Sequence, residues 1–237
     1  MPYRSLDPMQ IIATAEVLQR RVSERFPEAG LSKVANELVA LARDLADGAK
    51  ALEAPIWWLR IIIGLVIALG ASVFLFVGTI LSFDRTPTGA FDFVQGLEAS
   101  INTLLLAGLG LISLVSAEER IKRKRVFRQL HGLRSMIHVI DMHQLTKDPA
   151  ALKAGVHRTK SSPRRDLSPG DLARYLDYCS EMLSITGKLA ALFAQSVNDN
   201  IVVDAVNDIE ALGTNLSRKI WQKIMLIGET GLVTKSD

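Results

Sequence analysis

The sequence predicts an all-α membrane protein in which a two-helix transmembrane hairpin carries a cytoplasmic helical bundle built from N- and C-terminal amphipathic helices. Two uncharged apolar runs, 61–83 and 99–117, are separated by a short polar segment. Apolar residues recur at helical spacing before and after these runs, and no stretch alternates with the period of a strand. The chain has 237 residues, 49% of them hydrophobic, and a net charge of +3, which fits a membrane protein with large soluble parts.

Residues 1–54 are expected to form a cytoplasmic helical hairpin. Asp7 as a cap and Pro8 at the first helical position favour a helix start. Gly30 allows a turn, and Ser32 is expected to cap the second helix. Each helix carries one apolar stripe: Ile11, Ala15, Leu18, Val22 and Phe26 in the first, and Val34, Leu38, Leu41, Leu45 and Leu52 in the second. These stripes predict an intramolecular core rather than a dedicated partner-binding surface.

The first apolar run predicts a membrane-spanning helix over about 59–83. Its uncharged part, 61–83, is roughly 35 Å long as a helix, enough to cross a hydrocarbon core of about 30 Å. Trp57, Trp58 and Arg60 precede it, and such residues are favoured at the headgroup level. The alternative, a buried helix of a soluble domain, fits the uncharged length less well.

The second run, 99–117, is shorter and more polar, and it is expected to complete a transmembrane hairpin over 55–118. The connecting loop, 84–98, has Arg85 as its single basic residue, whereas lysine and arginine are frequent outside the hairpin. Basic residues are retained on the cytoplasmic side of a membrane. The sequence therefore predicts an integral protein of the plasma (inner) membrane with both termini in the cytoplasm.

The C-terminal region, 119–237, is expected to begin as a continuation of the second membrane helix. Gly132 is the one helix breaker between the second run and about Met142. Over this stretch the apolar residues keep a heptad spacing, in Val126, Leu130, Leu133, Ile137 and Ile140. A basic segment rich in serine and proline, 147–170, follows and is expected to be a loop.

Two further helices are predicted after this loop. Ser168 and Asp171 form a capping box for the first, and 198–200 is a turn before the second. The apolar seams are Leu172, Leu176, Cys179, Leu183, Thr186, Ala190, Phe193 and Val197, flanked by Tyr175, Met182 and Leu189, and then Val202, Val206, Ile209, Leu216, Ile220, Ile224 and Ile227. Such seams pack either within one bundle or as a coiled coil between chains, and the chain is expected to form a homo-oligomer.

No enzyme motif or cofactor motif is present in the chain. The sequence has no phosphate-binding loop, serine elbow or zinc-protease helix, and Cys179 lies on a seam position expected to be core. The residues that come closest to a metal site are His131, His138, Asp141 and His143. His143 points to another helix face than the other two histidines, so we interpret the four as polar surface residues and predict neither a metal nor a cofactor.

A cluster of basic residues follows the second run and is expected to contact anionic lipid headgroups. Each such residue near an anionic surface contributes about 1 kcal/mol. The cluster consists of Arg120, Lys122, Arg123, Lys124, Arg125 and Arg128. Nucleic acid is not an expected ligand because few aromatic residues are interleaved for base stacking and the cluster lies next to the predicted membrane span. Docking of an acidic cytoplasmic protein is the remaining alternative.

The two apolar runs also carry patterned polar and small residues. Gly64, Ala68 and Ser72 have the spacing that lets membrane helices approach closely. One face of the second run holds Glu98, Asn102, Leu106, Leu109, Ser113 and Ser116, which suits hydrogen bonding between helices or the lining of a pore. We therefore expect a non-enzymatic scaffold, sensor or partner platform. The alternative is an oligomeric pore or channel-type effector gated by its cytoplasmic helices.

Overall fold

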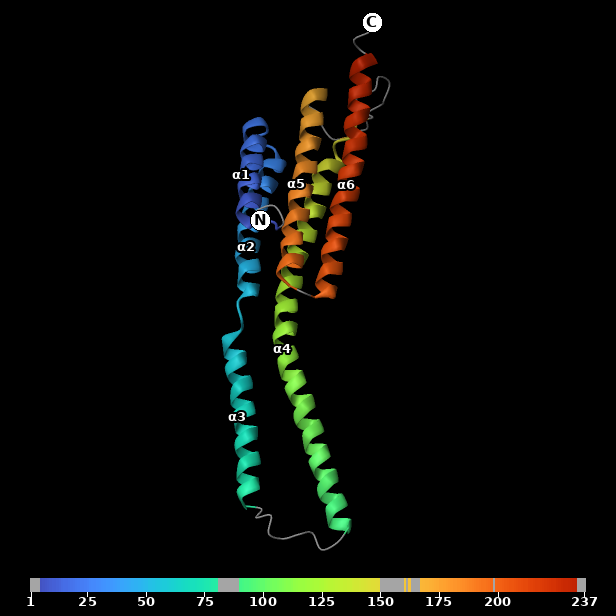
Figure 1. The fold of residues 1–237 in the computed structure, drawn as a ribbon. Coiled ribbons are helices and arrows are strands. Elements are labelled where there is room, and N and C mark those ends of the chain that lie inside the picture. Colours follow the sequence, from blue (N-terminus) through green and yellow to red (C-terminus); the bar gives the residue numbers. More distant parts are fainter. Residues whose placement is uncertain are drawn as a thin grey trace. The chain divides into compact units, whose positions relative to one another are not determined.

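The computed structural model describes residues 5–80, 90–149, 160, 162, 167–197 and 199–233. All regular structure in these residues is helical, as predicted. The helices are α1 (Pro8–Arg25), α2 (Gly30–Glu53), α3 (Trp57–Ile80), α4 (Ala90–Leu145), α5 (Pro169–Ser196) and α6 (Asn200–Val233) (Figure 1). They form two compact units: Met1–Glu53 with Arg125–Asp237, called the bundle unit below, and Ala54–Lys124, called the apolar unit. α4 contributes residues to both.

The bundle unit is held together by the apolar stripes that the sequence predicts. α5 packs against α6, α1 and α2, and α1 packs against α2 (Figure 1). The C-terminal part of α4 joins the same core, in which Val126, Leu133 and Ile137 are fully buried. Burying one such side chain contributes about 1.5–3 kcal/mol. Because these heptad seams are buried within a single chain, they are not available as a coiled-coil surface between chains.

Local sequence signals set several helix ends as predicted. Asp7 accepts a hydrogen bond from the backbone N–H of Met9 at 2.9 Å at the start of α1. Ser168 accepts one from the backbone N–H of Asp171 at 3.1 Å and donates one to its carboxylate at 2.7 Å, which completes the predicted cap of α5. On α6, a Cβ added to Gly213 would lie 3.6 Å from the carbonyl oxygen of Leu183, an ordinary contact distance, so α5 and α6 pack closely here and an alanine would also fit.

Two predictions about helix starts are wrong. Ser32 does not cap α2, because the helix already begins at Gly30; its side chain is buried and shares a hydrogen bond of 2.8 Å with Ser23 of α1. The loop 84–98 is also too long, because α4 begins at Ala90. Within 90–98, Gly96 is the one glycine and there is no proline, and a single glycine does not stop a helix. Residues 81–89, and most of the predicted loop 147–170, lie outside the described residues.

The apolar unit has no comparable core among its described side chains. Ile61, Leu65 and Leu69 of α3 are each more than 60% exposed, and the same holds for Leu104, Leu106 and Leu109 of α4. One helical stretch, within Gly30–Ser72, is long and apolar enough to cross a membrane, and 11% of its apolar window is buried. The described residues of α4 supply no second stretch of this kind, so one membrane-spanning helix is possible by length and composition.

The single cysteine provides a reporter for the bundle unit. Cys179 is fully buried, and loss of hydration raises the pKa of its thiol from 9.0 to about 12. A raised pKa in the folded state means that the thiol's contribution to stability is complete below pH 9 and decreases as the pH rises toward 12. We expect the unfolding free energy to fall between pH 8 and pH 10 by about 1 kcal/mol more in the natural chain than in Cys179→Val.

Urea unfolding of the detergent-solubilised chain at the two pH values measures this difference. All other titratable groups are the same in both chains, so the comparison isolates the thiol. Labelling of Cys179 by a thiol reagent at neutral pH should occur only as the bundle unfolds. An equal pH dependence in the two chains would mean that the thiol is not buried.

Candidate functional site

One carboxylate in the apolar unit collects three donors from two helices. Glu118 accepts a hydrogen bond from the backbone N–H of Ile56 at 3.4 Å and pairs with Lys122 Nζ at 3.1 Å. Arg60 Nε lies 3.6 Å from the second carboxylate oxygen. Lys122 first, and then Ile56 and Arg60, hold the pKa of Glu118 below its usual range. The carboxylate is therefore charged at neutral pH, and it joins the start of α3 to α4.

The predicted lipid-contact residues all lie on α4 around this carboxylate. Lys122 pairs with Glu118, and its side chain is 20% exposed. Arg120, Lys124, Arg125 and Arg128 are exposed, and Arg123 is half-buried. Most of the predicted cluster thus presents positive charge at the helix surface. The contact with anionic headgroups stays a prediction.

The predicted polar face and small-residue face lie on single helices of the apolar unit. Glu98, Asn102, Leu106, Leu109 and Ser113 are exposed on α4, and Ser116 is half-exposed. Two of the hydroxyls bond to their own helix: Ser116 Oγ donates to the carbonyl of Ile112, and Ser72 Oγ donates to that of Ala68, each at 2.8 Å. A Cβ added to Gly64 would have no atom within 4 Å. The lining of a pore and the close contact between membrane helices both stay predictions.

The bundle unit contains a chain of three polar side chains, centred on the buried Gln144, that the sequence did not predict. Lys223 of α6 donates to the side-chain oxygen of Gln144 at 2.6 Å and to its backbone carbonyl at 3.1 Å, in the last turn of α4. Gln144, which is 3% exposed, donates in turn to Asp141 at 2.6 Å. Burial lowers the pKa of Lys223. The sequence contains an indication of this chain, because the charged Lys223 falls on the apolar seam of α6 between Ile220 and Ile227.

The histidines considered for metal binding do not converge. His131 and His138 are exposed on α4, whereas His143 is half-buried with Nδ1 at 3.5 Å from the hydroxyl of Tyr175. Burial and the nearby Lys147 lower the pKa of His143. Within the part of the chain that the structure describes, no three histidine, cysteine or acidic side chains gather where they could hold a metal ion.

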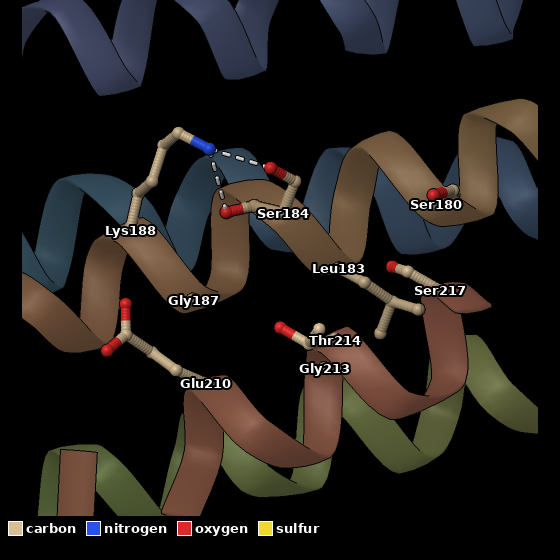
Figure 2. A pocket seen from close by; sticks show the side chains of 9 residues that line it. All are labelled: Ser180, Leu183, Ser184, Gly187, Lys188, Glu210, Gly213, Thr214 and Ser217. Atoms are coloured by element: carbon tan, nitrogen blue, oxygen red, sulfur yellow. Dashed lines mark hydrogen bonds between the residues drawn. The ribbon is translucent and has the colours of Figure 1, made fainter. Parts of the chain in front are cut away.

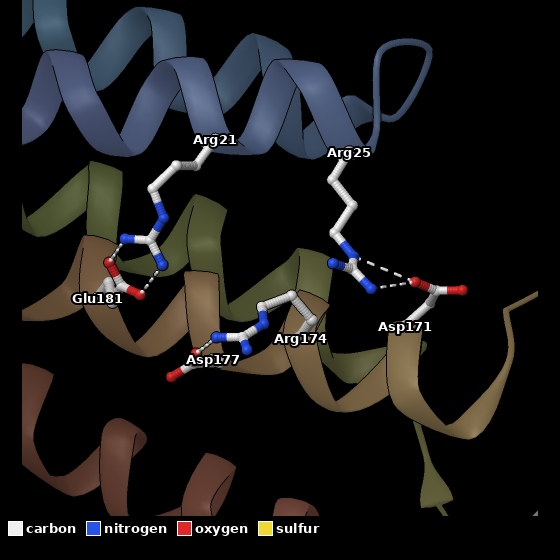
Figure 3. Close-up of polar contacts among 6 residues, drawn as sticks. All are labelled: Arg21, Arg25, Asp171, Arg174, Asp177 and Glu181. Carbon is white, nitrogen blue, oxygen red and sulfur yellow. Dashed lines mark hydrogen bonds and ion pairs between the residues drawn. The ribbon is translucent and has the colours of Figure 1, made fainter.

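Ion pairs link α1 to α5 across the bundle surface. Arg21 makes two hydrogen bonds with Glu181, at 2.8 and 3.0 Å (Figure 3). Its guanidinium also lies 5.1 Å from the ring centre of Tyr178. Arg25 binds Asp171 at 2.8 Å. These side chains are 34–47% exposed, so each pair contributes at most about 1 kcal/mol. They orient α1, while its buried stripe supplies most of the stability.

A cleft of about 340 Å³ lies between α5 and α6 (Figure 2). Its floor is formed by Leu183 and by the two glycines Gly187 and Gly213, which are all buried. Lys188 and Glu210 stand on opposite sides at one end (Figure 2). The walls carry the hydroxyls of Ser180, Ser184, Thr214 and Ser217.

A second cleft, of about 230 Å³, continues the same seam toward the start of α5. Gly170, Ala173, Arg174 and Asp177 line it from α5, and Trp221 and Ile224 line it from α6. Both clefts arise from the pairing of α5 with α6, so the spacing of residues within one helix could not predict them.

Comparison with protein-family models, curated proteins and solved structures finds no match to this chain.

Proposed function

We propose that the chain is an integral protein of the plasma membrane, in which α3 and the first part of α4 form a transmembrane hairpin and the bundle unit is a non-enzymatic platform in the cytoplasm. The observation that carries this proposal is the exposure of the apolar side chains of α3, such as Leu65 at 63% and Leu69 at 62%. A continuous apolar helix surface of this length is stable only where its surroundings are apolar.

The bundle unit supports the platform role because it has a complete core of its own. Its stripes are buried within the chain, so its stability does not depend on a partner. Its polar surface carries the paired charges of α1 and α5. The exposed cations that begin at Arg120 suit the cytoplasmic face of a membrane, where lysine and arginine are retained and anionic lipids attract them.

Reporter fusions test the topology. We expect a reporter after Asp237 to be cytoplasmic, and one inserted between Pro87 and Thr88 to be extracytoplasmic, because basic residues flank the hairpin on the side of the termini. Alkaline carbonate should leave the chain in the membrane fraction. If the reporter between Pro87 and Thr88 is cytoplasmic, the second run does not cross the membrane. If the reporter after Asp237 is extracytoplasmic, the proposed orientation is wrong.

A further inference from the structure

The two clefts lie one after the other along the seam between α5 and α6 of the bundle unit, and together they are called the groove below. The first runs from Lys188 and Glu210 to Ser217, and the second continues to Trp221. Two of the three floor residues of the first cleft, Gly187 and Gly213, have no side chain, and this leaves a hollow. Trp221, at the other end, is 52% exposed although tryptophan is usually well buried. The groove therefore carries a hollow and a projecting aromatic side chain on the same surface.

Charged side chains along this groove complement those of a second copy of the groove that runs antiparallel to it. Lys188 and Glu210 stand on α5 and α6 at the hollow end, and neither is in an ion pair within the described residues. At the other end Arg174 pairs with Asp177 at 2.8 Å and both remain partly exposed. An antiparallel copy of the groove would place Asp177 opposite Lys188, and Trp221 level with Glu210 at the hollow end.

The geometry permits the charge match and the seating of Trp221 with one two-fold axis. The midpoint between Asp177 and Lys188 on α5 is next to Leu183, and the midpoint between Glu210 and Trp221 on α6 is next to Leu216. Leu183 packs against α6 beside Gly213, three residues from Leu216. The two midpoints therefore lie within about one helical turn of each other along the seam. One axis at this level brings Asp177 of each copy to Lys188 of the other and places Trp221 over the partner's hollow.

We propose that this groove binds the same groove of a second copy of the chain, antiparallel, with Trp221 of each copy inserted into the hollow of the other. The inference deepens the proposed platform function, because it assigns the surface through which the platform self-associates. The heptad seams cannot form the contact between copies, because they are buried within each chain. An indole side chain fits a hollow of about 340 Å³.

Disulfide crosslinking in native membranes of the full chain tests the pairing. Ser217 lies close to the expected axis, so Ser217→Cys should give an oxidised dimer at least fivefold more abundant than Ser135→Cys, a matched change on the exposed face of α4. Buried Cys179 is common to both chains and does not react while the bundle is folded. Its resistance to thiol labelling also shows that each variant is folded.

Two further variants prevent the insertion of Trp221 into the partner's hollow without changing a core residue. Trp221→Ala removes the projecting side chain and Thr214→Trp fills the hollow, and each should reduce the Ser217→Cys dimer at least fivefold. Lys188→Glu should reduce it as well, and adding Asp177→Lys should restore it. A Ser217→Cys dimer no more abundant than the Ser135→Cys dimer, or one unaffected by both Trp221→Ala and Thr214→Trp, overturns the proposal.

Carbonate extraction of the same membranes separates this inference from the proposed function. A chain that stays in the membrane and does not crosslink refutes the groove pairing alone. A chain that crosslinks as predicted and is released by carbonate supports the groove pairing and refutes the membrane anchor.

Discussion

Replacing both Leu65 and Leu69 by arginine should release the chain from the membrane fraction. Each residue lies in the uncharged part of α3 and is more than 60% exposed. Leucine favours the centre of a membrane helix by about 0.5 kcal/mol, whereas arginine opposes it by about 2.5–3.5 kcal/mol. The two changes together therefore oppose insertion by about 6 kcal/mol, which is more than the second, more polar run is expected to offset.

The measurement is the fraction of chain that sediments with membranes after alkaline carbonate. Ser135→Arg with Gln222→Arg is the matched control, because it adds the same two charges at exposed positions of the bundle unit. The control should remain in the membrane fraction. If the α3 variant also remains there, α3 is not the anchor; if the natural chain is already extracted, the proposed membrane location is wrong.

The sequence was sufficient to predict the helices of the bundle and their buried faces. Leu18, Leu38, Leu133 and Leu183 come from four different helices, and all are almost completely buried. Burial of these residues follows from local periodicity, because a helix with one apolar stripe has only one face that can form a core. The same reasoning identified the cap at Ser168, where the side chain and its partner are three residues apart.

Features that depend on which helices are neighbours could not be predicted in this way. Ser32 is a plausible cap by position, but its partner is Ser23 of the preceding helix. Glu118 was passed over although Lys122 follows one turn later, since its contacts with Ile56 and Arg60 need α3 beside α4. Each of these contacts joins residues that are distant in sequence or separated by a turn, and periodicity within a helix carries no information about them.

Lys223→Met should lower the unfolding free energy of the bundle by about 1–3 kcal/mol. The substitution leaves the side-chain oxygen of Gln144, which is nearly inaccessible to water, without its donor. It also removes the donor to the backbone carbonyl of Gln144, in the last turn of α4. Methionine keeps most of the volume of the lysine stem, so a cavity contributes little to the loss.

Removing the other partner, by Gln144→Leu, should lower the unfolding free energy by at least as much as Lys223→Met. It leaves the half-buried ammonium of Lys223 with one acceptor instead of two, and a charged group without its partners is more unfavourable than a neutral one. Asp141 also loses a donor, but it is partly exposed and water can replace the amide. Urea unfolding of the detergent-solubilised variants measures both losses.

The double variant Lys223→Met with Gln144→Leu distinguishes this polar pair from simple packing. When both partners are apolar, Lys223 and Gln144 leave no unsatisfied side-chain donor or acceptor, so the double variant should be within about 1 kcal/mol of the natural chain. The sum of the two single losses should therefore exceed the double loss by at least about 1 kcal/mol, which is the coupling energy. Additive losses would instead mean that the two side chains act independently. A large coupling would show that the end of α4 is fixed to α6 by this pair, since the backbone carbonyl that Lys223 also binds belongs to the last turn of α4.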